Sequence, residues 1–126
     1  MILIKAIVLP ERVVMIKDTL QEQGFHGITT KNSHGYGEQK LTIKKVYRGH
    51  VFEERVDAVS RVELELVVGE EKVDEVIDII RDSGSSGEGG DGRIYVFPLA
   101  RSIHIGSGTK HLGCQEEEDE EEEEDI

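Results

Sequence analysis

The sequence has no tryptophan, two prolines and a single cysteine, Cys114, among its 126 residues. One cysteine excludes an internal disulfide and fits a reducing compartment, so we expect a cytoplasmic location. No apolar run approaches the roughly 20 residues that span a bilayer, and the first residues do not resemble a signal peptide. Direct membrane insertion is therefore not expected.

Positive charge is also scarce. The chain has 15 basic against 27 acidic residues, but residues 116–125 are all Asp or Glu, so the remainder is nearly neutral. Repulsion within such a run prevents collapse, and we predict a disordered acidic tail over residues 109–126, following a single domain at residues 1–108. The absence of a basic stripe excludes nucleic acid as an expected partner.

Aromatic residues make up only 5% of the chain, so the core must consist mainly of Ile, Val and Leu. The clearest strand is residues 59–68, where Val62, Leu64 and Leu66 point to one face and charged residues to the other. Other segments show apolar runs or helical spacing. The predicted strands are 2–9, 27–33, 59–68, 93–97 and, more briefly, 101–105; the predicted helices are 11–23 and 70–81.

The order strand, helix, strand, long loop, strand, helix, strand is typical of the ferredoxin-like βαββαβ fold, an α+β fold with an antiparallel sheet. Both helices cover one face of such a sheet. The opposite face would expose apolar side chains to water, so we expect the chain to oligomerise.

Two segments do not fit this pattern of helices and strands. Residues 35–57 form a long polar connection between two strands, and a connection of that length is usually functional or disordered. Residues 83–92 contain five glycines. Such a loop is either a phosphate cradle built from backbone N–H groups or a flexible connector. It lacks the lysine and the spacing of the common nucleotide-binding motifs.

Several segments in order resemble the PII family of signal-transduction proteins. The resemblance spans residues 1 to about 108, and its order and spacing are more specific than any one motif. The matching segments are Lys5-Ala6-Ile7-Val8 followed by Pro10, Gly24-Phe25-His26-Gly27-Ile28-Thr29, Gly35-Tyr36-Gly37-Glu38-Gln39-Lys40, Tyr47-Arg48-Gly49 and Gly90-Asp91-Gly92-Arg93-Ile94-Tyr95-Val96.

This resemblance implies a homotrimer that binds an adenine nucleotide, ATP, ADP or AMP, between neighbouring subunits. Mg²⁺ with 2-oxoglutarate can join the nucleotide in that family. The long connection, about residues 36–57, corresponds to the family's T-loop, which docks onto a regulated enzyme or transporter, including membrane transporters. The glycine-rich segment, about residues 83–92, corresponds to its B-loop. The chain is then a regulator that responds to a small-molecule effector.

The resemblance also implies site residues. Gln39 matches the glutamine that ligates Mg²⁺ through its side-chain oxygen, a hard ligand suited to that ion. Arg61 matches a lysine that contacts phosphate or 2-oxoglutarate. The expected nucleotide-binding residues are Thr29, Gly35, Gly37, Gln39, Arg61, Gly87, Gly90, Asp91, Gly92, Arg93 and His104. The expected partner-binding residues of the T-loop are Lys40, Tyr47, Arg48, Gly49 and Phe52.

The sequence departs from the family at three phosphate-binding positions. Glu88 replaces a lysine of the B-loop, and His104 and Gly106 replace two arginines that grip the nucleotide. Each lost cation removes roughly 1.5–3 kcal/mol of charged hydrogen bonding, which weakens triphosphate binding. We therefore expect ADP or AMP to be at least as good a ligand as ATP. The tyrosine that is uridylylated in some relatives aligns near Phe52 or Glu54 of this chain. The absence of a tyrosine at these positions disfavours that modification.

The sequence also bears on two other functions. A CutA-like trimer that binds divalent metals is the alternative; the acidic tail and the histidines favour it, whereas the loop at residues 90–93, Gly37 and Gln39 oppose it. Catalysis is not expected, because no Ser/His/Asp or Cys/His set is apparent and no carboxylate pair has a defined setting.

Overall fold

The computed structural model describes residues 1–112, except for the side chains of residues 36–45, 47 and 52–58. Residues 113–126, which include Cys114 and the predicted acidic tail, lie outside the described residues. Within residues 1–112, no helix combines the length and the apolar content needed to cross a membrane.

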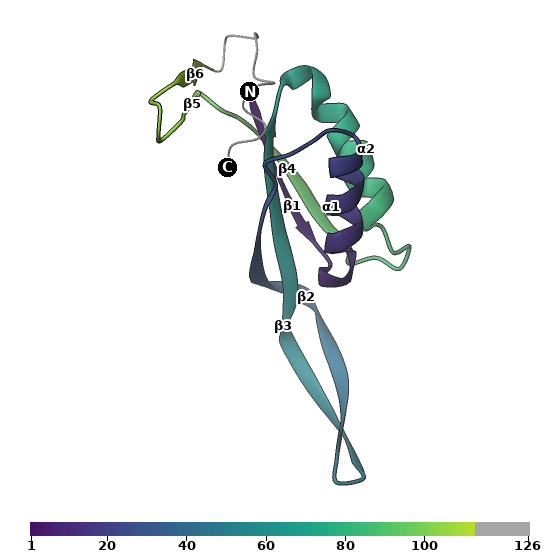
Figure 1. The fold of residues 1–126 in the computed structure, drawn as a ribbon. Coiled ribbons are helices and arrows are strands. Elements are labelled where there is room, and N and C mark those ends of the chain that lie inside the picture. The colour runs from purple at the N-terminus through teal and green to yellow at the C-terminus, as the bar shows by residue number, and fades with distance from the viewer. Residues whose placement is uncertain (113–126) are drawn as a thin grey trace.

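Four strands form one antiparallel sheet in the order β2-β3-β1-β4 (Figure 1). The central strand β1 (Ile2–Val8) lies between β3 (His50–Val68) and β4 (Gly92–Pro98), and β2 (Thr29–Tyr47) lies at the edge beside β3. This order and the two helices between the strands confirm the predicted α+β, ferredoxin-like fold.

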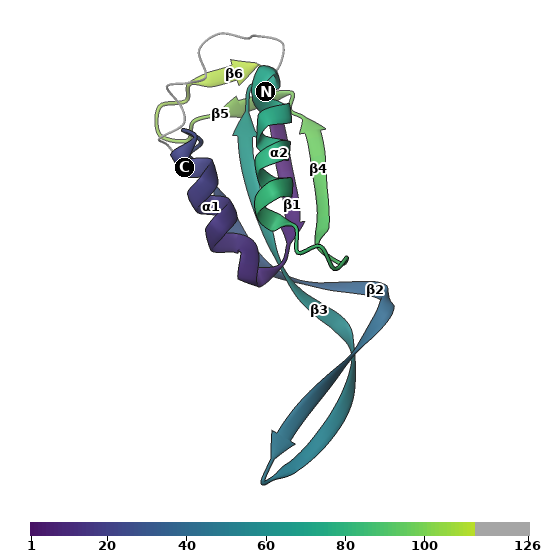
Figure 2. The same ribbon diagram turned by 90° about the vertical axis from the view of Figure 1, so that its right-hand side faces the viewer.

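Both helices, α1 (Val13–Glu22) and α2 (Val73–Gly84), cover the same face of the sheet, as Figures 1 and 2 show. A 3₁₀ turn precedes each helix, at Pro10–Arg12 and at Glu70–Lys72. The first turns of the two predicted helices are therefore 3₁₀ rather than α. The second helix also continues three residues beyond its predicted end at residue 81, so Ser83 and Gly84 belong to it.

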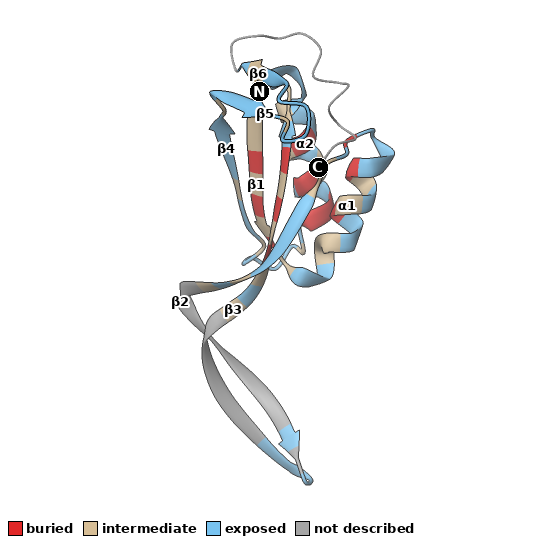
Figure 3. Cartoon of the chain, turned by 60° about the vertical axis from the view of Figure 1, so that its left-hand side comes forward, coloured by how far each residue is buried: buried red, intermediate tan, exposed pale blue. Residues whose placement is uncertain are grey.

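The core fills the space between this sheet face and the helices (Figure 3). The predicted alternation in β3 is confirmed, because Val62, Leu64 and Leu66 are buried. The helices supply residues at helical spacing, and β1 supplies every second side chain. The buried core consists of Ile4, Ala6, Val8, Ile16, Leu20, Phe25, Val62, Leu64, Leu66, Val76 and Ile80.

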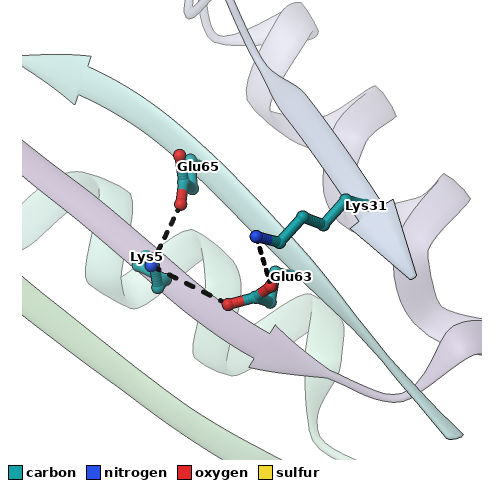
Figure 4. Close-up of polar contacts among 4 residues, drawn as sticks. All are labelled: Lys5, Lys31, Glu63 and Glu65. Atoms are coloured by element: carbon teal, nitrogen blue, oxygen red, sulfur yellow. Dashed lines mark ion pairs between the residues drawn. The ribbon is translucent and has the colours of Figure 1, made fainter. Parts of the chain in front are cut away.

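The opposite face of the sheet carries a ladder of ion pairs, which we call the charged ladder (Figure 4). Lys5 Nζ lies 3.2 Å from Glu65 Oε1 and 3.8 Å from Glu63 Oε1. Lys31 Nζ lies 3.2 Å from the other oxygen of Glu63. Glu63 joins three neighbouring strands in this way, and its side chain is 15% exposed.

Residues 35–57 are not the irregular connection that we predicted. They continue β2 and β3 as an antiparallel two-stranded ribbon, which projects beyond the rest of the domain (Figures 1 and 2). The turn is Arg48-Gly49, with φ of 52° and 80°. Two positive φ values match a type I′ turn, whose twist suits a hairpin. Backbone pairing therefore organises a segment that lacks a clear apolar pattern.

The start of the predicted tail also differs from the prediction. Strand β6 (Lys110–Leu112) lies within the predicted tail and pairs with β5 (Arg101–Ile103). The connection is closed by two backbone hydrogen bonds of 2.8 Å, from His104 N to Thr109 O and from Gly108 N to His104 O. These bonds satisfy the backbone of a segment that the nearby acidic run led us to predict as unstructured.

We expect Glu63→Gln to lower the free energy of unfolding by about 1 kcal/mol at low salt, because the amide keeps the shape of the carboxylate but loses its attraction to both lysines. Urea denaturation at fixed protein concentration measures this. The loss should shrink as NaCl rises, since salt screens partly exposed pairs. Glu22→Gln on the exposed end of α1 is the control. An equal, salt-independent loss in both variants would contradict the ladder's contribution.

Candidate functional site

The glycine-rich loop (residues 83–92) lies at the end of the sheet from which the ribbon projects (Figure 2). It leaves the last turn of α2 and enters β4 at Gly92, which pairs with Val8, the last residue of β1. Val8 also pairs with Val62, and the residues of β3 before Val62 belong to the ribbon. The loop and the ribbon therefore begin beside the same end of β1.

Four glycines of this loop have positive φ: Gly87 at 81°, Gly89 at 84°, Gly90 at 71° and Gly92 at 111°. Side chains rarely tolerate this conformation, so the path of the loop requires glycine. At Gly92 the constraint is also steric, because an added Cβ atom would lie 1.7 Å from the carbonyl oxygen of Ile7. Close backbone packing on β1 thus fixes where the loop ends.

Asp91 and Ser86 hold the shape of the loop. Asp91 Oδ1 accepts hydrogen bonds from the backbone N–H of Ser86, at 3.1 Å, and from its hydroxyl. The hydroxyl bond, then the backbone bond, lower the pKa of Asp91, helped by the charges of Arg12 and Arg61 and opposed by partial burial. Ser86 Oγ also accepts from Glu88 N at 3.2 Å. Asp91 is therefore a carboxylate that orders the loop.

Arg61 ties the loop to the base of the ribbon. Its Nη2 donates to the carbonyl of Gly90 at 2.8 Å, and its Nη1 donates to the carbonyl of Ser60 at 2.9 Å. Arg61 is the residue of β3 directly before Val62, where pairing with β1 begins. The structure thus brings Arg61 into contact with Gly90 and close enough to Asp91 for its charge to act on that carboxylate.

Gly35 and Gly37 lie where the ribbon leaves the sheet. Gly35 pairs with Val59, and an added Cβ there would lie 3.9 Å from the Val59 carbonyl oxygen. Residues 37–40 then lie opposite residue 57 alone, which is a bulge in β2. Bulges of this kind are common beside functional sites. The bulge contains Gly37, Gln39 and Lys40. The structure does not describe the side chains of Gln39 and Lys40, so the predicted Mg²⁺ ligand lies outside the described residues.

Thr29 and His104 lie away from the loop within one chain. Thr29 pairs with Glu65, which pairs with Lys5 in the middle of β1. His104 follows β5, at the end of the sheet opposite the loop and the ribbon (Figures 1 and 2). Its Nδ1 accepts a hydrogen bond from the backbone N–H of Ser107 at 3.3 Å.

The remaining predicted residues are spread over β4 and the ribbon. Arg93 is exposed on β4 opposite Ile7, one residue beyond the loop. Arg48 and Gly49 form the exposed turn at the tip of the ribbon. The side chains of Tyr47 and Phe52 lie outside the described residues.

Sequence reasoning missed Ser86, which makes the bonds that shape the loop. A serine five residues before an aspartate is not a recognised motif, and the contact depends on the positive φ values between them. Among the described residues, no group of three or more His, Cys, Asp and Glu is placed to hold a metal ion.

Comparison with known proteins identifies the family. The model of the nitrogen regulatory protein P-II family matches residues 1–109. The chain belongs to the P-II family. It is 38% identical to nitrogen regulatory protein P-II of Bradyrhizobium diazoefficiens, over 86% of this chain and 95% of that protein. It is 35% identical to nitrogen regulatory protein P-II 2 of Methanothermobacter thermautotrophicus, over 83% of this chain and 89% of that one.

A third P-II protein, from Pasteurella multocida, is 34% identical over 86% of this chain and 94% of its own length. These matches confirm the resemblance read from the sequence, and the CutA-like alternative receives no support from them. P-II proteins are regulators, so the loop and the ribbon are best considered as parts of a regulatory protein.

We expect Gly92→Ala to destabilise the fold by more than about 2 kcal/mol, because the new methyl group must displace the β1 backbone and also adopt a strained φ. Gly87→Ala is the matched control: it has a similarly positive φ, but nothing lies within 4 Å of an added Cβ. Its cost should be near 1 kcal/mol, from strain alone. Equal losses in urea denaturation would contradict the close approach at Gly92.

We expect Ser86→Ala to raise the pKa of Asp91 toward its ordinary value, because the largest cause of its lowering is removed. An NMR titration of the Asp91 carboxyl carbon in both proteins measures this. A carboxyl group with a lowered pKa stabilises the folded state above its unfolded pKa, about 3.9, and that contribution is lost as pH falls through the folded pKa. The stability difference between wild type and Asp91→Asn should therefore be constant near neutral pH and shrink below about pH 4. The same Asp91 pKa in Ser86→Ala would contradict this assignment.

Proposed function

We propose that this chain is a homotrimeric signal-transduction regulator that binds an adenine nucleotide in the clefts between subunits and controls a transporter or an enzyme through the ribbon at residues 36–57. Its expected place of action is the cytoplasm. It performs no catalysis of its own in this proposal.

One observation carries the proposal: the expected nucleotide-binding residues fall into two groups at different places on the sheet. Arg61 and the glycine-rich loop lie at one end, whereas His104 lies beyond the other and Thr29 along the edge strand. Within the described residues of one chain, the two groups therefore lie apart. A second copy that brings its His104 end to the loop of the first would complete the site, which supports a cleft between subunits.

The chemistry of the loop supports an anionic ligand of low charge. Glycines with positive φ allow a phosphate to approach backbone N–H groups closely. Glu88 and Asp91 place negative charge on the loop, with Arg61 and Arg93 beside it. A balance of this kind suits ADP or AMP at least as well as ATP. Mg²⁺ with 2-oxoglutarate would bind near Gln39, in the bulge at the base of the ribbon.

The ribbon supplies a surface for a protein partner. At its tip, Val46 and Val51 lie opposite each other and are 72% and 64% exposed. Exposed apolar side chains beside a tight turn are suited to contact another protein. The partner-binding residues we propose are Lys40, Tyr47, Arg48, Gly49 and Phe52, and a membrane transporter is one class of partner.

Isothermal titration calorimetry with ATP, ADP and AMP, each with and without Mg²⁺ and 2-oxoglutarate, tests the proposal. We expect saturable binding with up to three equivalent sites per trimer, and ATP no tighter than ADP or AMP. A monomeric protein, or one that binds none of the three nucleotides at millimolar concentration, would refute it.

The variant Glu88→Lys tests the role of charge in the loop. Replacing an anion by a cation beside the phosphates should raise the affinity for ATP by about tenfold or more and raise that for AMP less. Glu22→Lys makes the same change of charge on α1 and should leave the affinities unchanged. A uniform small gain in both variants would point to net charge alone.

A further inference from the structure

Arg61 has a contact that a simple ligand-binding residue does not need. In the described chain its guanidinium is hydrogen-bonded to two backbone carbonyls, that of the preceding residue Ser60 at the base of the ribbon and that of Gly90 in the glycine-rich loop. The two acceptors are far apart in sequence and belong to the two parts of the molecule that the proposed function must couple. We call this pair of bonds the arginine clasp.

The position of the clasp matters for coupling. Arg61 pairs with Ser33 on β2. Pairing of β3 with β1 begins only at the next residue, Val62, so at Arg61 the strand pair has no third strand beside it. The ribbon is therefore free of the main sheet from Arg61 outward. A bond from this residue to the loop restrains the ribbon at its base.

The acceptors of the clasp are neutral carbonyls. A guanidinium attracts an anionic oxygen more strongly than a neutral carbonyl oxygen because the charges are opposite, and its planar fork can hold two oxygens at once. An anionic group seated on the loop beside Gly90 would compete with the carbonyl for the same N–H donors. An added Cβ at Gly90 would lie 3.9 Å from Nη2, so the guanidinium lies directly beside the backbone of the loop at this glycine.

We propose that Arg61 is a positioning residue with two states: without ligand it clasps the carbonyl of Gly90, and a phosphate-bearing ligand draws it away and so releases the base of the ribbon from the loop. This inference rests on the proposed function for its ligand, but not for the clasp itself. The ligand class is a nucleoside phosphate, and the response is a change in the backbone of residues 33–36 and 58–61.

The variant Arg61→Lys separates the two roles. Lysine keeps the positive charge for a phosphate but lacks the planar fork that reaches two carbonyls. The control is Arg81→Lys, the same change at an exposed position in the last turn of α2. Amide hydrogen exchange, followed by mass spectrometry, is measured for residues 33–36, 58–61 and 85–91 with and without saturating ADP.

In the absence of ADP, Arg61→Lys should speed exchange in residues 85–91 by about threefold or more, while the control and the core strands are unchanged. In the wild type, ADP should change exchange at 33–36 and 58–61. Arg61→Lys should bind ADP more weakly, because Arg61 is itself an expected phosphate contact, but at saturating ADP that change should be absent.

Three results would overturn the clasp. One is an unchanged loop in ligand-free Arg61→Lys. Another is an ADP response at the base of the ribbon that survives in the variant. The third is a variant that loses ADP binding with no change in the ligand-free loop, because Arg61 would then be a plain ligand contact. Failure of the wild type to bind any nucleotide refutes the proposed function instead, and the ligand-free comparison still decides whether the clasp exists.

Discussion

The short central strand is the constraint on which the rest of the structure depends. β1 ends at Val8, before Pro10, which has no backbone N–H to donate to a neighbouring strand. Strands β2 and β3 are each 19 residues long, so they continue without a third partner. The same strand end receives Gly92, where the glycine-rich loop enters the sheet. The ribbon and the loop are neighbours because β1 is short.

The two faces of the sheet are stabilised by different interactions. The helix side is filled by aliphatic residues, whereas the other side carries the charged ladder flanked by exposed apolar residues such as Tyr95 and Phe97. In the proposed trimer this open face is the one available for covering. Its charges are already paired within the chain, so a partner surface need not supply counter-charges, although it must not leave Glu63 or Lys5 without its present partner.

Much of the fold is predictable because it follows from side-chain burial. Alternation in residues 62–66 and helical spacing around Val76 report directly which side faces the core, and the structure buries those residues. The ribbon is different: its backbone projects beyond the sheet and the helices (Figure 1), and its sequence has no clear apolar pattern that could reveal it. Arg48-Gly49 also lacks the Asn-Gly or Asp-Gly pair that usually marks such a turn.

The candidate site shows the same division. Family resemblance indicated the glycines, Asp91 and Arg61, and the structure groups them at one end of the sheet. The contacts themselves, from Ser86 to Asp91 and from Arg61 to Gly90, depend on the path that four positive φ values impose on the loop. The sequence shows which residues can adopt positive φ values, but it does not show which contacts the resulting loop makes.

The loop obtains its shape and its connection to the ribbon from different interactions. Bonds between Ser86, Glu88 and Asp91 are local, so they can persist whether or not a ligand is present. The bond from Arg61 crosses from the base of the ribbon to the loop, and it joins a cation to a neutral acceptor, which an anion can replace. Under the proposed function, a loop that keeps its form while one outside bond is exchanged would respond to ligand binding without unfolding, and Arg61 would transmit that response to the base of the ribbon.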